Sequence, residues 1–253
     1  MIIAPFNSVY FLLLFLIVAL AVGITLLMKN KSDKAKEKVL IGICLFNLCF
    51  YVVYKLGLYF RTPGIPADYL YMPWKELPLH LCNISLMLVP IGIAKHKDFL
   101  LAYGIYIAPL GAVLALSFPE TGFHSMNLFY FHMIGYYGTH AIIILVGILS
   151  VSLGLYKPTM KKILPMFGLI VALSLGALGI NLLIRQFTGT PANYFYVVEP
   201  MGISILELFW SWIPVPYLYC LPGIAIFAGY SVLITLPFTL ISKKKTKKLA
   251  KVA

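Results

Sequence analysis

The sequence predicts an all-α membrane protein, a bundle of seven transmembrane helices that forms a single domain over residues 1–253. Composition is the first observation: 61% of the residues are hydrophobic and only 11% are charged, whereas soluble domains carry about a quarter charged residues. The second is that apolar runs of about 20 residues, the length that crosses a hydrocarbon core, recur along the whole chain. These runs are continuous rather than alternating, which favours helices over a transmembrane barrel.

Seven spans follow from these runs, and we expect no soluble domain between them. The first lacks a preceding basic region and is too long for a cleaved signal, which predicts a retained helix. The third is short and starts at Pro78, a residue suited to a first helical position. The segment 200–216 is apolar but broken by prolines, so we expect an interfacial or partly re-entrant piece there rather than another crossing. The predicted limits are 8–28, 39–60, 78–94, 99–117, 129–156, 163–187 and 216–241.

The placement of lysines predicts the orientation of the bundle. Loops 29–38, 95–98 and 157–162 and the C-terminal tail carry five, two, three and six lysines, which is 16 of the 20 basic residues. With seven spans these loops and the tail share one side, so we expect the N-terminus outside and the tail in the cytoplasm of a cell-membrane protein. The net charge of +12 raises the question of nucleic-acid binding. Topology and contact with lipid headgroups account for the lysines, so we expect no nucleic-acid partner.

Polar side chains inside the predicted spans need a partner or a cavity, because ionisable groups within a membrane are costly. His132, Tyr136 and His140 recur every four residues and therefore form one stripe along the fifth span. Gly135 and Gly138 beside them permit close approach of a neighbouring helix. The second span contains a shorter stripe of the same kind, formed by Asn47, Tyr51 and Lys55.

The third span begins with the segment LPLHLCNISLMLVP, in which His80 and Cys82 lie two residues apart. On a helix this spacing turns the two side chains about 200° apart, so His80 is not expected to act as the base for Cys82 if both are helical. Cys82, close to a helix N-terminus, is a candidate thiol nucleophile with His140 or His132 as its base. Cys82 and His140 reach the same level only if the fifth span is counted back from Tyr156 rather than forward from its start.

Plainer roles compete with catalysis for each of these residues. Free cysteines are commonly buried as small hydrophobic residues, and membrane histidines often only bridge helices. An oxyanion is stabilised by backbone N–H groups or amide side chains, and the candidates are the start of the third span, Asn181 and Asn193. The Asn193–Tyr194 pair beside Pro191 is typical of a turn with an aromatic interface anchor. No ligand-pair spacing supports a metal, and we expect neither a metal nor a cofactor.

Five segments resemble, in the same order, the YwaF-like bacterial membrane proteins, which are related to eukaryotic transmembrane protein 164. They are LPLHLCNIS, FPETGFHS, YYGTHAIIIL, GINLLIRQFTGTPANYFYVVEP and WIPVPY, and the similarity extends from about residue 45 to 240. The resemblance implies a seven-helix fold and a bacterial cytoplasmic membrane. The eukaryotic relatives are regarded as cysteine-dependent acyltransferases that move polyunsaturated acyl chains onto ether phospholipids. The more distant androgen-induced-gene hydrolases are thought to cleave lipid esters with a threonine and a histidine.

By position, the resemblance implies that Cys82 is the nucleophile and His140 its paired histidine. Motif positions without an assigned role fall on His80, Asn181, Asn193 and Tyr194. Two positions depart from the usual pattern: Asn83 follows the HLC motif, where an acidic or hydroxyl residue is common, and Ala141 follows the span-five histidine, where glycine is common.

The resulting hypothesis is a lipid acyltransferase or lipid-ester hydrolase that acts on membrane lipids in the outer half of the bilayer. His132 and Tyr136 join the unassigned motif residues as candidates for a substrate pocket. Two alternatives stay open: a transporter or lipid-handling protein with a polar intramembrane pocket, and a structural membrane protein without a site. The sequence does not indicate an oligomeric state.

Overall fold

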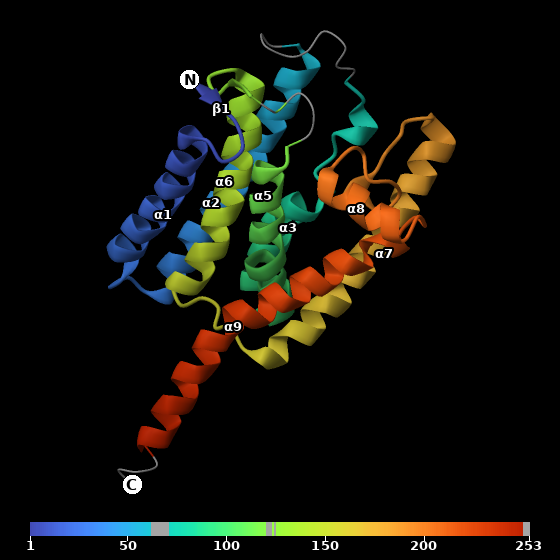
Figure 1. Ribbon diagram of the computed structural model, residues 1–253. Helices are drawn as coiled ribbons and strands as arrows, with labels where there is room; N and C mark the ends of the chain where they lie inside the picture. Colours follow the sequence, from blue (N-terminus) through green and yellow to red (C-terminus); the bar gives the residue numbers. More distant parts are fainter. Residues whose placement is uncertain (62–70, 120–122, 124, 250–253) are drawn as a thin grey trace.

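The computed structural model describes residues 1–61, 71–119, 123 and 125–249, and these form an all-helical bundle (Figure 1). The N-terminus lies at one end of the bundle, and the last helix extends beyond the opposite end. The described elements, in chain order, are β1 (Ile2–Ile3), α1 (Ser8–Met28), α2 (Asp33–Tyr59), η1 (Pro73–Lys75), α3 (Leu81–Ala94), α4 (Asp98–Ala102), η2 (Tyr103–Ile107), α5 (Ala108–Ser117), β2 (Met126–Asn127), α6 (Phe131–Ser152), η3 (Met160–Lys162), α7 (Ile163–Thr188), η4 (Tyr194–Tyr196), α8 (Ser204–Trp212), η5 (Leu218–Cys220) and α9 (Leu221–Leu249).

Among the described residues, six helical segments are long and apolar enough to cross a membrane. They correspond to the predicted spans except the third, which is the 14-residue helix α3. At 1.5 Å per residue α3 is about 21 Å long, short of a hydrocarbon core of about 30 Å. The predicted start at Pro78 is wrong: α3 begins at Leu81, because Leu77–Leu79 forms a tight turn in which the Leu79 N–H donates to the Leu77 carbonyl at 2.7 Å. The Pro-broken segment contains α8, whose nine residues are also too few to cross.

The two ends of the bundle are fixed by contacts between distant loops. At one end β1 pairs with β2, and the Tyr10 hydroxyl is 2.9 Å from the Ser117 hydroxyl. At the other end the lysine-bearing loops gather, because residues from the 29–38, 95–98 and 153–157 regions line one small cavity there and Lys162 pairs with Asp98 at 3.1 Å. The three basic loops therefore lie together, as the lysine pattern predicts.

Helix α6 is the centre of the bundle and packs against α1, α2 and α5. The glycines of its stripe permit this approach, as expected. A Cβ atom on Gly135 would lie 2.2 Å from Cδ2 of Tyr54, and one on Gly138 would lie 2.9 Å from Cε1 of Phe50, both on α2. Asn47 adds a polar bond across the same interface, since its Nδ2 donates to the Thr139 carbonyl at 3.0 Å.

The segment between α4 and α5 is a five-residue π-helix, η2, and all five residues are buried. Gly104 in this segment approaches α3 so closely that a Cβ atom would lie 2.2 Å from Cγ2 of Val89. The Tyr103 hydroxyl donates to the Leu81 carbonyl at 2.6 Å. These two contacts join η2 to α3, and the Tyr103 bond holds the first turn of α3 in place.

Candidate functional site

The site begins at the first turn of α3. His80 precedes this helix with an extended backbone, φ −74° and ψ 155°, and its side chain does not cap the helix. The first helical bond runs from the Ile84 N–H to the His80 carbonyl at 3.1 Å. Within the described residues, no backbone oxygen accepts from the N–H groups of Leu81, Cys82 or Asn83, because a helix leaves its first N–H groups without intrahelical partners.

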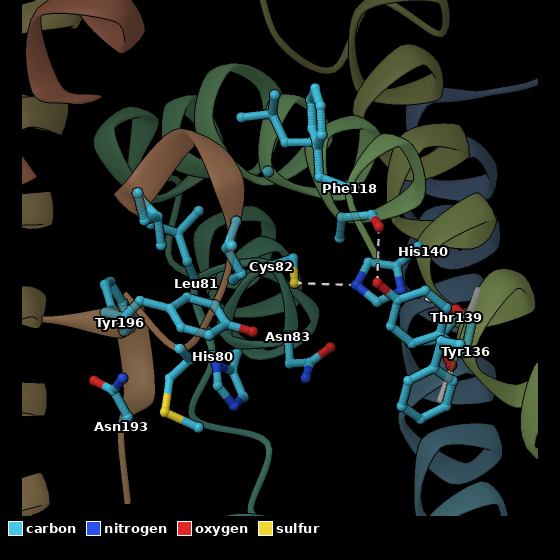
Figure 2. A pocket seen from close by; sticks show the side chains of 18 of the residues that line it. His80, Leu81, Cys82, Asn83, Phe118, Tyr136, Thr139, His140, Asn193 and Tyr196 are labelled. Atoms are coloured by element: carbon cyan, nitrogen blue, oxygen red, sulfur yellow. Dashed lines mark hydrogen bonds between the residues drawn. The ribbon is translucent and has the colours of Figure 1, made fainter. Parts of the chain in front are cut away.

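Cys82 and His140 are in contact. The Cys82 Sγ atom lies 3.5 Å from Nε2 of His140, and both side chains are buried. Figure 2 shows the thiol of α3 pointing at the imidazole of α6. This separation is within hydrogen-bond reach for a sulfur atom, and it is longer than the ~2.6–3.2 Å typical of a nucleophile and its base, a distance that is often looser without substrate.

The other ring nitrogen of His140 decides which tautomer faces the thiol. Nδ1 lies 2.8 Å from the carbonyl oxygen of Tyr136, one turn earlier on α6. A carbonyl can only accept, so Nδ1 carries the proton and Nε2 presents its lone pair to Cys82. The ring of Tyr136 also packs against the imidazole with centroids 4.6 Å apart. The arrangement is that of a thiol, a base and a group that orients the base.

The two residues share a level for a reason that differs from the sequence expectation. Helix α6 starts at Phe131, so His140 is nine residues, or about 14 Å, along it. The condition that the fifth span must start late is therefore wrong. Contact arises instead because α3 starts deep in the bundle, and Cys82 is only its second residue.

A cavity of about 290 Å³ opens onto this pair. Its walls come from α2, the 75–76 segment, the start of α3, α5, α6, the η4 loop, α8 and α9. Asn83 and Thr139 lie beside the pair, and their buried Oδ1 and Oγ1 atoms have no hydrogen-bond partner within the described residues. Irregular backbone at this depth is tolerated where it lines such a cavity.

Three charged residues that the sequence reading did not assign to the site also line the cavity. Lys55 forms a salt bridge with Glu76 at 2.5 Å, and the Tyr51 hydroxyl donates to the Glu76 carbonyl at 2.9 Å. Lys75 forms no salt bridge within the described part of the chain. In the sequence, only the stripe of Tyr51 and Lys55 on the second span indicated that this side of the cavity is charged. The stripe did not reveal Glu76, the residue of the 75–76 segment that pairs with Lys55.

The structure divides the predicted pocket residues into two groups. His80, Tyr136 and Asn193 line the cavity with Cys82 and His140. The ring of His80 packs against Tyr194 and Tyr196, with centroids 5.2 and 5.4 Å away. The separation of about 200° that would apply if both residues were helical does not hold for this pair, because His80 lies before the helix.

His132, Asn181 and Tyr194 do not line the cavity, which corrects their assignment to a substrate pocket. His132 is two turns before His140 on α6, 1% exposed, and its ring stacks on Tyr130 with centroids 5.9 Å apart. Neither of its ring nitrogens has a hydrogen-bond partner within the described residues. His140 is therefore the histidine positioned to act on Cys82.

Asn181 and Asn193 hold the loop that follows α7. The Asn181 amide donates to the Tyr194 carbonyl at 3.0 Å and accepts from the Tyr194 N–H at 2.8 Å, so its polar atoms are occupied. Asn193 bonds the Glu199 carbonyl at 2.6 Å and the Val198 N–H at 3.0 Å. These contacts position the wall of the cavity and occupy the amide groups of both residues.

Tyr194 joins this loop to the 71–80 segment. Its hydroxyl donates to the Trp74 carbonyl, and burial raises the pKa of Tyr194 to about 12. The phenol therefore stays protonated and keeps donating at physiological pH. Tyr194 lies behind the cavity wall, where it connects two segments that both reach the cavity.

The FPETGFHS segment and the potential metal ligands also concern this region. Residues 120–122 and 124 of the FPETGFHS segment lie outside the described residues, while Phe118 and Phe123 of that segment line the cavity. No cluster of His, Cys, Asp and Glu within the described ranges has the arrangement of a metal site.

Comparison with curated proteins and with solved structures gives no match. Residues 4–238 match the TMEM164 family, which covers nearly the whole chain. The match confirms the resemblance seen in the HLC, TGTPANY and WIPVPY segments. Together with the six long apolar helices it establishes a multi-pass membrane protein. The chain therefore belongs to the TMEM164 family.

Proposed function

We propose that this protein is a membrane-embedded acyl-transfer enzyme, a lipid acyltransferase or lipid-ester hydrolase, in which Cys82 is the nucleophile and His140 the general base. The observation that carries the proposal is the 3.5 Å contact between Sγ and Nε2, with Nδ1 bonded to the Tyr136 carbonyl. A thiol that is only packed in a core needs neither a base nor access for a substrate, whereas Cys82 has an oriented imidazole beside it and a cavity that reaches it.

In the first step Nε2 takes the thiol proton while Sγ attacks the carbonyl carbon of a lipid ester. The tetrahedral intermediate collapses as the carbon–oxygen bond breaks, and the leaving alkoxide receives the proton from Nε2. The products are a lysolipid and a Cys82 thioester. In the second step Nε2 accepts a proton from an incoming hydroxyl while its oxygen attacks the thioester carbon. The carbon–sulfur bond then breaks, and the leaving thiolate takes the proton back from Nε2, which restores the thiol.

The oxyanion of each intermediate needs donors close to Sγ. The N–H groups of Cys82 and Asn83 are suited to this role, because they lie in the first turn of α3 beside Sγ and no backbone oxygen accepts from them within the described residues. The partial positive charge of the helix N-terminus acts in the same direction and is strongest in the first turn. Removing one oxyanion donor typically costs 10²- to 10³-fold in rate, roughly, in enzymes that use such a site.

We further propose that the chain crosses the membrane seven times, with the N-terminus outside and the C-terminus in the cytoplasm. The 71–80 segment and α3 would together make the third passage, since α3 alone is too short. Two observations support this: α9 extends beyond the end of the bundle opposite the N-terminus (Figure 1), and the basic loops share one end. The catalytic pair then faces a cavity that opens toward the outer half of the bilayer.

The test is covalent capture of an acyl group on Cys82. The full-length protein in nanodiscs is incubated with a phospholipid that carries an alkyne-tagged acyl chain. The labelled residue is located by mass spectrometry, and loss of the label on hydroxylamine treatment identifies a thioester. We expect a hydroxylamine-sensitive label on Cys82 that disappears in Cys82→Ala and forms at least about tenfold more slowly in His140→Ala. Cys49→Ala is the matched control, because Cys49 is an exposed thiol on α2.

A label that survives Cys82→Ala, or unlabelled wild-type protein together with unchanged membrane lipids, would refute the enzyme proposal. The transporter alternative rests on the short α3 helix, since discontinuous helices line binding sites in transporters. It predicts lipid or solute movement in proteoliposomes that persists in Cys82→Ala.

A further inference from the structure

The cavity that holds Cys82 and His140 differs in chemistry on its two sides. One side carries Lys55, Lys75 and Glu76, and continues to His80 and Asn193. On the other side, the lining residues that the structure describes are apolar and come from α5, α8, α9, Phe118 and the 201–203 segment. Figure 2 shows Phe118 on one side of the line between Cys82 and His140, with His80 and Asn193 on the other. The reaction described above uses the centre of this cavity and leaves the apolar side without a role.

The apolar side is a groove along one face of α5. Gly111, Leu114, Ala115 and Phe118 line it, at positions i, i+3, i+4 and i+7. These four residues therefore form a single stripe about 10 Å long. The stripe starts beside α3, because a Cβ atom on Gly111 would lie 2.9 Å from Cδ2 of Leu81, the residue before Cys82. It leads away from the thiol toward the end of α5.

The facing wall is formed by α8 and the start of α9. Ile205 and Leu206 of α8 and Phe227 of α9 line the groove and are half-buried. At the rim the side chains of Phe118 and Met201 are 42% and 37% exposed. The groove therefore continues from the thiol to an exposed apolar rim on a protein whose long helices lie in the bilayer.

We propose that this groove is the acyl-chain subsite, and that Ala115 sets the bulk of chain that it accepts. The inference rests on the proposed function, because it places the chain of the ester that Cys82 attacks. An alkyl chain is the occupant that matches the groove. Its described lining residues carry no hydrogen-bonding side chain, so a polar headgroup there would lose its hydration without compensation. The ester's polar portion then lies on the side of Lys55, Lys75 and Glu76, where charged groups line the wall.

Ala115 is suited to control bulk because its backbone is fixed while its side chain is small. The Tyr136 hydroxyl donates to the Ala115 carbonyl at 2.8 Å, which ties this turn of α5 to the turn of α6 that carries His140. A larger side chain at position 115 cannot move away with its backbone and must occupy the groove. Leu114 is the complementary position, where truncation widens the groove.

The location of the chain is tested without any reaction. Cys82→Ala protein in nanodiscs is irradiated with a phospholipid that carries a diazirine within its acyl chain, or with one that carries the diazirine on its headgroup. We expect the acyl probe to cross-link to peptides from 111–118 and 203–209, and the headgroup probe to peptides around Lys75. Acyl cross-links confined to the outer faces of α1 and α7, or headgroup cross-links within 111–118, would overturn the inference.

Specificity is tested by acyl-enzyme formation from a short butyryl ester and a long palmitoyl ester. Ala115→Leu is expected to lower the ratio of palmitoyl to butyryl labelling about tenfold, because the misfit of a few methylene groups in an enzyme pocket has effects of this size. Leu114→Ala is expected to favour branched or cyclic chains that the wild type rejects. Val113→Leu, on the same helix but outside the cavity lining, is the control and should keep the wild-type ratio.

Failure of this inference differs from failure of the proposed function. Cys82 labelling that is present in every variant with one unchanged chain preference refutes the groove and leaves the nucleophile in place. Absence of any Cys82-dependent labelling, with acyl cross-links still at 111–118, refutes the enzyme and leaves the groove as a lipid-binding site.

Discussion

Gly135 on α6 allows a direct test of the packing that carries His140. In Gly135→Ala the new Cβ atom would lie 2.2, 2.4 and 2.7 Å from Cδ2, Cγ and Cβ of Tyr54. Each distance is well inside ordinary van der Waals contact, which begins at 3.4 Å. Because Tyr54 Cβ is anchored to the backbone, side-chain rotation alone does not relieve the overlap. Helix α2 must shift relative to α6, and Tyr54 also lines the cavity.

The magnitude follows from comparison with a glycine that meets nothing. Overpacking of this kind costs about 1–3 kcal/mol. Replacing a helical glycine by alanine also reduces backbone entropy in the unfolded state, but Gly176→Ala on α7 gains the same benefit, and a Cβ there has no heavy atom within 4 Å. The difference between the two variants isolates the clash. For a chain of this size it corresponds to about 2–12 °C in the apparent melting temperature.

The assay is thermal unfolding of both variants and the wild type in the same detergent, followed by tryptophan fluorescence. We expect Gly135→Ala to melt below Gly176→Ala by that interval, with slower alkylation or acylation of Cys82 where the protein stays folded. Equal melting temperatures for the two variants would mean that α2 and α6 do not approach closely at Gly135, and the basis for the position of His140 would fail.

Three further predictions concern the first turn of α3, the η4 loop and the topology. Tyr103→Phe removes the hydroxyl that bonds the Leu81 carbonyl, and we expect it to lower the stability by about 1 kcal/mol. We also expect a lower kcat for Cys82 acylation with little change in KM. Thermal melting and labelling kinetics measure the two effects, and Tyr230→Phe is the control. Asn181→Ala leaves the buried N–H and C=O groups of Tyr194 without partners, so we expect the free energy of unfolding to fall by about 2–4 kcal/mol, measured as a lower melting temperature. Glu199→Gln affects only a half-exposed ion pair and should change stability by less than about 1 kcal/mol. In a background without the four native cysteines, Pro191→Cys should react with a membrane-impermeant maleimide in intact cells and Lys97→Cys only after lysis; the reverse pattern would invert the proposed orientation.

Most of the helical architecture could be predicted from hydropathy. The limits 8–28, 99–117 and 163–187 lie within a residue or two of the helical segments found, because an apolar run of fixed length must satisfy its backbone internally when it is in a membrane. The start of α3 was misplaced, since Pro78 suits a first helical turn but the backbone of 77–79 closes a tight turn instead. No local pattern distinguishes these two uses of a proline.

The candidate site could be predicted only in part. The motif resemblance pointed to Cys82 and His140, and the period of four on α6 put Tyr136 where its carbonyl holds Nδ1. The same period also promoted His132, which the fold buries against Tyr130 away from the cavity. Lys75 and Glu76 gave no signal at all, because they lie outside any periodic segment and reach the cavity only through the path of the chain before α3.

The sequence by itself determined that the chain is a membrane protein, which residues form its long helices, and which small residues permit helices to approach. These are local properties, set by the apolarity and size of successive side chains. Only the tertiary structure decided that Cys82 meets His140. That contact depends on how deep α3 starts relative to α6, and this depth is set by contacts between distant segments: Tyr103 with Leu81, Gly104 with Val89, and Gly135 with Tyr54. The contact between Cys82 and His140 is thus a product of packing rather than of sequence spacing.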